Sequence, residues 1–142
     1  MNVFDHNRVI LCHFDTYSAA SLFARYGTSL LTPNPLPEGA KPGSAPSEIL
    51  EIHSPEKVLG ALVEKYDFDP AELMIAESFQ EWMESESGPI RIHLAKFKTF
   101  DPPRDEIEAT GGIFKPISEL RSTQPVELNL LRAAFNVVMS GG

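Results

Sequence analysis

The chain of 142 residues has little cysteine, no long apolar run, and one segment without any positive charge. Cys12 is its only cysteine, which excludes an internal disulfide and a cysteine-rich zinc site. No segment approaches the roughly 18 apolar residues that span a bilayer, and the first residues do not combine a basic stretch with an apolar run. The sequence therefore predicts a soluble, cytoplasmic protein that does not enter a membrane.

Positive charge is also scarce in the chain as a whole. Twelve Lys and Arg residues stand against twenty Asp and Glu residues, which gives a formal net charge of −8. Nonspecific affinity for nucleic acid comes mainly from Lys and Arg, so nucleic acid is not an expected partner. The stretch Phe97–Arg104 mixes aromatic and basic residues as single-stranded nucleic-acid platforms do, but one such stretch in an acidic chain is weak evidence.

What is present indicates one α+β domain over residues 1–142, and 42% hydrophobic residues suffice for its core. Apolar runs and alternation predict three to four short strands; periodicity, caps and prolines predict four to five helices. A small three-layer α/β fold is the alternative. The expected strands are Val9–Phe14, Ser47–His53, Ile90–Leu94 and the edge strand Ile113–Ile117. The expected helices are Ser18–Tyr26, Pro55–Tyr66, Pro70–Ser87, Asp101–Thr110 and Pro125–Met139.

The excess of negative charge is concentrated between Tyr66 and Ile90, where seven carboxylates occur without a Lys or Arg. On the expected helix Pro70–Ser87, helical geometry puts Glu77, Glu81 and Glu84 together on the face opposite the apolar stripe. This face is either a solvated surface, a docking face for a basic protein partner, or the internal counterpart of the basic stretch that follows. A cation site is least supported, because the spacing matches no hard-metal loop, and no metal or cofactor is expected.

His13 and Asp15 form the most enzyme-like pair, because they stand two apart at the end of the first expected strand. Ligands of open α/β sheets collect at the carboxyl ends of strands. If the strand that carries His93 lies beside the first one, His13, Asp15 and His93 form a constellation that can do general acid–base chemistry or hold one metal ion. The structural interpretation is that Asp15, Thr16 and Ser18 cap the helix expected to follow, and that His13 and His93 occupy ordinary polar positions.

Prolines and glycines mark residues 33–46 as an exposed loop within the domain, which is either a plain surface excursion, a proline-rich ligand segment or a lid. No catalytic signature stands out anywhere. The first hypothesis is therefore a non-enzymatic module that binds a macromolecule through Glu77, Glu81 and Glu84 or through this loop. The alternative is a small α/β enzyme or ligand-binding domain with a His/Asp pocket at the end of the first strand. A homo-oligomer that uses the apolar C-terminal helix is compatible with either.

Overall fold

The computed structural model describes residues 2–15 and 17–141. Within them, eight strands form one mixed sheet. The strands are β1 (Asn7–Asp15), β2 (Ala20–Arg25), β3 (Leu31–Thr32), β4 (Lys41–Gly43), β5 (Leu73–Ile75), β6 (Glu81–Ser85), β7 (Gly88–Phe97) and β8 (Ile113–Pro116). The α-helices of the same residues are α1 (Pro55–Tyr66), α2 (Arg104–Ala109) and α3 (Pro125–Met139). Short 3₁₀ turns cover Val3–Asp5, Glu51–His53, Pro70–Glu72 and Ile117–Glu119.

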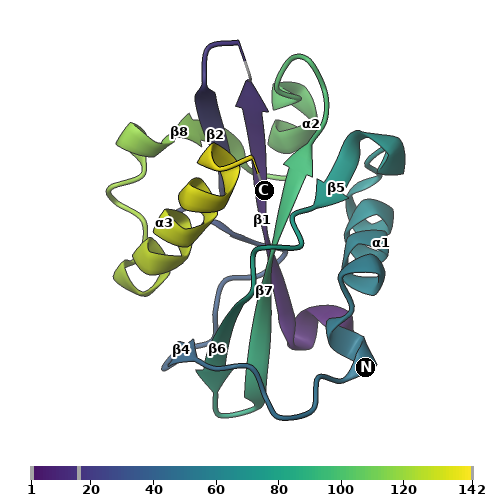
Figure 1. Cartoon of the computed structure of the whole chain (residues 1–142), viewed down its shortest axis with the longest axis vertical. Coiled ribbons are helices and arrows are strands. Elements are labelled where there is room, and N and C mark those ends of the chain that lie inside the picture. The colour runs from purple at the N-terminus through teal and green to yellow at the C-terminus, as the bar shows by residue number, and fades with distance from the viewer. Residues whose placement is uncertain (1, 16, 142) are drawn as a thin grey trace.

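The two long strands β1 and β7 form the centre of the sheet (Figure 1). They run parallel to each other, and every other pairing is antiparallel within the described residues. The strand order is β4-β6-β7-β1-β2-β8, while β3 adds to β1 and β5 adds to the far end of β7. The carboxyl ends of β1 and β7 therefore meet at the same edge of the sheet.

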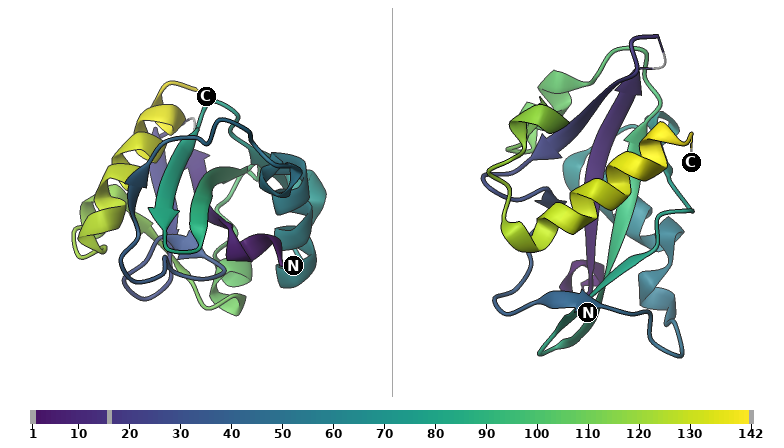
Figure 2. Two further views of the ribbon diagram at one scale, coloured as in Figure 1. Left: turned by 90° about the horizontal axis from the view of Figure 1, so that it is seen from below. Right: turned by 60° about the vertical axis from the view of Figure 1, so that its left-hand side comes forward.

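Helices cover both faces of this sheet, with α3 on one side and α1 on the other (Figure 2). The α3 side is a core that includes Ile10, Ile92 and Leu94 from the strands and Leu131 from the helix. The opposite core includes Val9 and Leu11 of β1 with residues of α1 and α2. Neighbouring residues of the central strands thus enter different cores, and both faces are shielded from water.

A buried carboxylate joins α3 to the chain between β2 and β3. Glu127 is fully buried, and its two carboxylate oxygens accept hydrogen bonds from the Leu30 backbone N–H at 2.7 Å and the Ser29 hydroxyl at 2.8 Å. Burial raises the pKa of Glu127, and these two hydrogen bonds oppose the increase. The contact fixes where α3 begins over the sheet.

The expected count of strands and helices is wrong, because two expected helices are extended chain. Residues of the first, Ser18–Tyr26, form β2, which pairs antiparallel with β1. Phe23 packs in the α3-side core and Ala24 in the opposite core. A strand buried on both faces shows no clean alternation, so its apolar spacing imitates a helical stripe.

The expected acidic helix Pro70–Ser87 is also wrong. The segment is a 3₁₀ turn, the short strand β5, a connection, and β6. Ala76, Phe79 and Met83 do pack in one core, but they reach it from the connection and from β6 instead of from a helix. Gly88 begins β7 after a tight hairpin in which Ser85 pairs with Gly88. Pairing with β7 along the sheet overrides the helical periodicity of the apolar residues.

Several other expectations are confirmed. Helices form at Pro55–Tyr66 and Pro125–Met139, strands form over Val9–Phe14 and Ile90–Leu94, and β8 lies at a sheet edge. The segment Ser47–His53 is not a strand: it is irregular and ends in a 3₁₀ turn. None of the helices in residues 2–15 and 17–141 combines the length and apolar character required to cross a membrane.

Candidate functional site

The structure places His13 and His93 on neighbouring strands but does not bring them together. In the parallel pairing of β1 and β7, His13 lies opposite Phe97, whereas His93 lies opposite Val9. The two histidines share a face of the sheet, and four residues along a strand separate them by about 13 Å. Leu11 and Ala95 fill the space between these positions. One proton relay or one metal ion cannot use both imidazoles.

His13 instead holds the chain that follows β7. Its side chain is 1% exposed, and its Nε2 hydrogen is donated to the backbone carbonyl of Thr99 at 2.8 Å. A second contact on the same segment is the Lys98 backbone N–H, which donates to the Glu72 carbonyl at 2.7 Å. These two hydrogen bonds fix the backbone immediately beyond the carboxyl end of β7.

Asp15 ends β1 and organises the turn that follows it. Its carboxylate accepts hydrogen bonds from the Tyr17 backbone N–H at 2.9 Å and from the Ser18 hydroxyl at 3.0 Å. The Tyr17 N–H first, and the Ser18 hydroxyl next, lower the pKa of Asp15. The carboxylate is therefore ionised at neutral pH and is already occupied as a hydrogen-bond acceptor in this turn.

A cleft of about 420 Å³ opens where the carboxyl ends of β1 and β7 meet. Its lining residues come from the ends of both strands and from β5: Phe14, Asp15, Tyr17, Met74, Lys96, Phe97, Lys98, Thr99 and Phe100. The volume lies within the range of small-molecule sites, and the carboxyl ends of parallel strands are a common position for such sites. Asp15 is the one residue of the predicted constellation that lines this cleft.

Two aromatic rings at the cleft are unusually exposed. Tyr17 is 87% exposed and Phe100 is 79% exposed, and their rings meet edge to face with centroids 6.1 Å apart. Met74 adds a third apolar side chain, which is 42% exposed. Large apolar side chains gathered in this way at a cleft mark an interaction site more often than scattered ones do.

Positive charge accompanies these rings. Lys96 and Lys98 line the same cleft as Asp15, so the three charged side chains sum to a net charge of +1 in a chain whose net charge is −8. Lys98 is exposed. The cleft therefore combines apolar ring surface with ammonium groups that attract an anion.

His93 belongs to a different group of residues, which is buried near the start of β1. The Asn7 side-chain oxygen accepts hydrogen bonds from His93 Nε2 at 2.9 Å and from His53 Nδ1 at 3.1 Å. The Asn7 amide nitrogen donates to the carbonyls of Val3 and Ile52. Burial first, and the charge of Arg91 next, lower the pKa of His93 to about 3. His93 is a neutral structural residue of this network at physiological pH.

The three acidic residues do not share a face. Glu77 lies in the connection before β6, and Glu81 and Glu84 lie on β6. Glu81 pairs with Ile92 on the α3 side of the sheet, whereas Glu84 stands with Trp82 on the other side, because an odd spacing along a strand reverses the side. Binding of a basic protein by these residues stays a prediction, without the common surface that motivated it.

Sequence reasoning missed Tyr17 and Met74, and it included Phe100 only as part of the stretch Phe97–Arg104. The aromatic and basic stretch Phe97–Arg104 was a signal for part of the cleft, but nothing in the sequence placed it beside the end of β1. Among the described residues, no group of three His, Cys, Asp or Glu side chains is arranged to hold a metal ion. No protein-family model matches the chain, and no curated protein matches it significantly.

Proposed function

We propose that the chain is a ligand-binding domain whose cleft at the ends of β1 and β7 takes a small planar aromatic anion, such as a mononucleotide. The observation that carries this proposal is the pairing of two exposed aromatic rings, Tyr17 and Phe100, with two lysines in one cleft. Each half of that chemistry recognises one half of the ligand.

The rings recognise the planar part of the ligand. A planar base that packs against an aromatic side chain gains roughly 1–3 kcal/mol of binding free energy. In the free protein, the edge-to-face contact of Tyr17 and Phe100 leaves most of both rings in water. Binding that covers this apolar surface is therefore favourable.

The lysines recognise the anionic part. An ammonium group is a compact point charge that donates to phosphate or carboxylate oxygens from several directions. Lys96 and Lys98 are two apart in sequence and both line the cleft. In an extended backbone, residues two apart point to the same side. The negative charge of Asp15 at the same cleft disfavours a second anion.

Binding rather than catalysis is favoured by how the predicted acid–base groups are used. His13 Nε2 is bonded to Thr99, and the Asp15 carboxylate accepts from Tyr17 and Ser18. His93 lies about 13 Å from His13 along the strands. The groups that a proton-transfer reaction would need are committed to structure.

Calorimetric titration with three related compounds tests the proposal. Adenosine 5′-monophosphate supplies ring and charge, adenosine supplies the ring alone, and ribose 5-phosphate supplies the charge alone. Adenosine 5′-monophosphate should bind at least about tenfold more tightly than either part, because each part lacks one set of contacts worth 1 kcal/mol or more.

Variants locate the binding. Phe100→Ala and Lys98→Gln should each weaken binding about fivefold or more, since both side chains are exposed and their loss leaves the core intact. Lys65→Gln, an exposed lysine of α1 away from the cleft, is the matched control and should bind as the wild type does. Equal affinity for all three compounds, or equal affinity of the cleft variants and the wild type, would refute the proposal.

A further inference from the structure

A second cavity, of about 310 Å³, lies between the first turn of α1, the β5–β6 connection and β7. Its apolar wall includes Ile75, Ala76 and Phe79. Its charged lining residues are Arg91 on β7, Glu56 on α1 and Glu77 in the connection. This cavity shares no residue with the cleft at the ends of β1 and β7.

Arg91 supplies the positive charge of this cavity. Its guanidinium donates one hydrogen bond to the His53 carbonyl at 3.1 Å, and its central carbon lies 5.6 Å from the centre of the Trp82 ring. Its Nε is buried without a hydrogen-bond partner. In the described part of the chain, the ion pairs are Lys57–Glu51 and Lys115–Glu119, so Arg91 has none. A partly buried cation of this kind is stabilised by a bound carboxylate.

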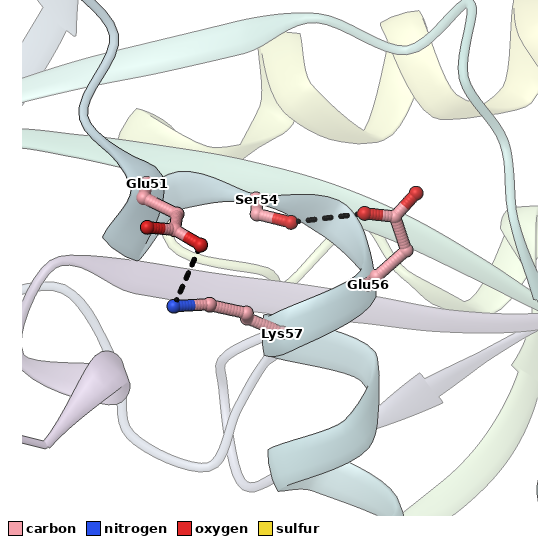
Figure 3. Close-up of polar contacts among 4 residues, drawn as sticks. All are labelled: Glu51, Ser54, Glu56 and Lys57. Carbon is pink, nitrogen blue, oxygen red and sulfur yellow. Dashed lines mark hydrogen bonds and ion pairs between the residues drawn. The ribbon is translucent and has the colours of Figure 1, made fainter.

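Neither carboxylate of the cavity forms an ion pair with a residue that the structure describes. Lys57 follows Glu56 in the chain, but Figure 3 shows Lys57 turned to Glu51, with which it pairs at 3.0 Å. Glu56 instead accepts a hydrogen bond from the Ser54 hydroxyl at 3.1 Å (Figure 3). Glu77 is exposed and forms no ion pair with any residue that the structure describes.

One cavity thus holds a positive group and two negative groups that form no ion pair with one another. His93 adds a polar atom to the lining: because its Nε2 donates to Asn7, the neutral ring has an acceptor at Nδ1. Separated opposite charges beside an apolar wall are complementary to a small zwitterion with an apolar substituent.

We propose that this cavity binds a free α-amino acid with an apolar side chain. The ligand carboxylate pairs with Arg91, the ammonium group donates to Glu56 and Glu77, and the side chain packs against Ile75 and Phe79. Guanidinium is the side-chain group best matched to a carboxylate, because its fork of N–H donors fits both oxygens. The proposal is independent of the ligand in the β1–β7 cleft.

NMR titration of the full chain with L-leucine tests this site, with the backbone amides of Ala76 and Phe79 as reporters. N-acetyl-L-leucine lacks the ammonium charge, and L-leucinamide lacks the carboxylate. Each should bind about tenfold more weakly than L-leucine, because each loses a charge-assisted hydrogen-bonded pair. The reporters should shift saturably with L-leucine at millimolar concentration.

Surface variants keep the test independent of folding. The double variant Glu56→Gln with Glu77→Gln should bind L-leucine about tenfold more weakly than the wild type does. Its affinity for N-acetyl-L-leucine should be unchanged, since only the contact with the ammonium group is removed. Glu64→Gln, an exposed carboxylate of α1 that does not line the cavity, is the matched control. The absence of saturable shifts with leucine, valine and methionine, or equal binding of L-leucine and its acetylated form, would overturn the proposal.

Discussion

Lowering the pH should destabilise the fold through His93, because this imidazole is neutral and buried in the folded chain but titrates normally in the unfolded chain. His93 is 2% exposed, its Nε2 donates to Asn7, and Arg91 stands two residues away on the same strand. Burial, followed by the charge of Arg91, lowers the pKa of His93 from 6.5 to about 3. Between these two pH values the unfolded chain binds a proton at His93 and the folded chain does not, so the free energy of unfolding falls as the pH falls.

The size of the effect follows from the two pKa values. At pH 5, which is about 1.5 units below the pKa of 6.5 in the unfolded chain, protonation of His93 stabilises the unfolded state. At 1.36 kcal/mol per unit, this stabilisation is about 2 kcal/mol. At pH 7.5 the same contribution is close to zero. A loss of about 2 kcal/mol is a substantial part of the stability of a small domain.

Urea unfolding of the wild type and His93→Gln at about pH 7.5 and about pH 5, at constant ionic strength, measures this contribution. Glutamine does not titrate, and its side-chain N–H can donate to Asn7 in place of Nε2. Groups other than His93 titrate in both proteins and cancel in the comparison. The wild type should lose about 2 kcal/mol more than the variant over this interval. An identical pH dependence of the two proteins would refute the assignment of a strongly lowered pKa to His93.

Two further substitutions test the packing. Glu127→Ala should cost about 3 kcal/mol in a urea titration, because it leaves a buried backbone N–H and a buried hydroxyl without an acceptor. Glu127→Gln should retain most of the stability; since burial raises the pKa of Glu127, the wild type loses stability relative to this variant as the pH rises above 4.5, and the opposite trend would contradict the raised pKa. Gly112→Ala should cost about 1–3 kcal/mol, because the added Cβ would lie 2.7 Å from Cζ of Tyr26. Its control is Gly60→Ala in α1, where nothing lies within 4 Å and a gain of about 0.5–1 kcal/mol is expected in thermal unfolding; a cost equal to that of Gly112→Ala would contradict the steric explanation.

Local signals in the sequence were sufficient for some elements of the fold. Pro55 and Pro125 mark the first turns of α1 and α3, and each is followed by an apolar stripe that packs on the sheet. Local patterns also predicted two strands, namely the apolar run of β1 and the alternation at the start of β7. The order of strands, and the parallel pairing that joins the ends of β1 and β7, depend on contacts distant in sequence and have no local signal.

Two segments were expected to be helices and are strands: β2, which the sheet buries on both faces, and the chain from β5 to β6. Residues of β2 enter both cores, so the period of two that identifies a half-buried strand is absent. β5 is three residues long, and the apolar residues that follow it reach the core through a connection. In both segments, apolar spacing of three and four arose from tertiary packing.

The candidate site was predictable only in part. Asp15 was identified from its position at the end of a strand, and Phe97–Arg104 was identified from its composition. The contribution of Tyr17 and Phe100 depends on their exposure and on the 6.1 Å contact between their rings, which join segments more than eighty residues apart. The distance between His13 and His93 depends on the register of β1 against β7, which no local pattern encodes.

The most direct measurement is an NMR titration of the full chain with adenosine 5′-monophosphate, in which amide shifts locate the bound ligand. Saturable shifts confined to the ends of β1 and β7, including Tyr17, Lys98 and Phe100, and much smaller shifts with adenosine are the expected result. If adenosine 5′-monophosphate causes no saturable shift, or causes shifts away from this cleft, the cleft is not a site for a planar aromatic anion.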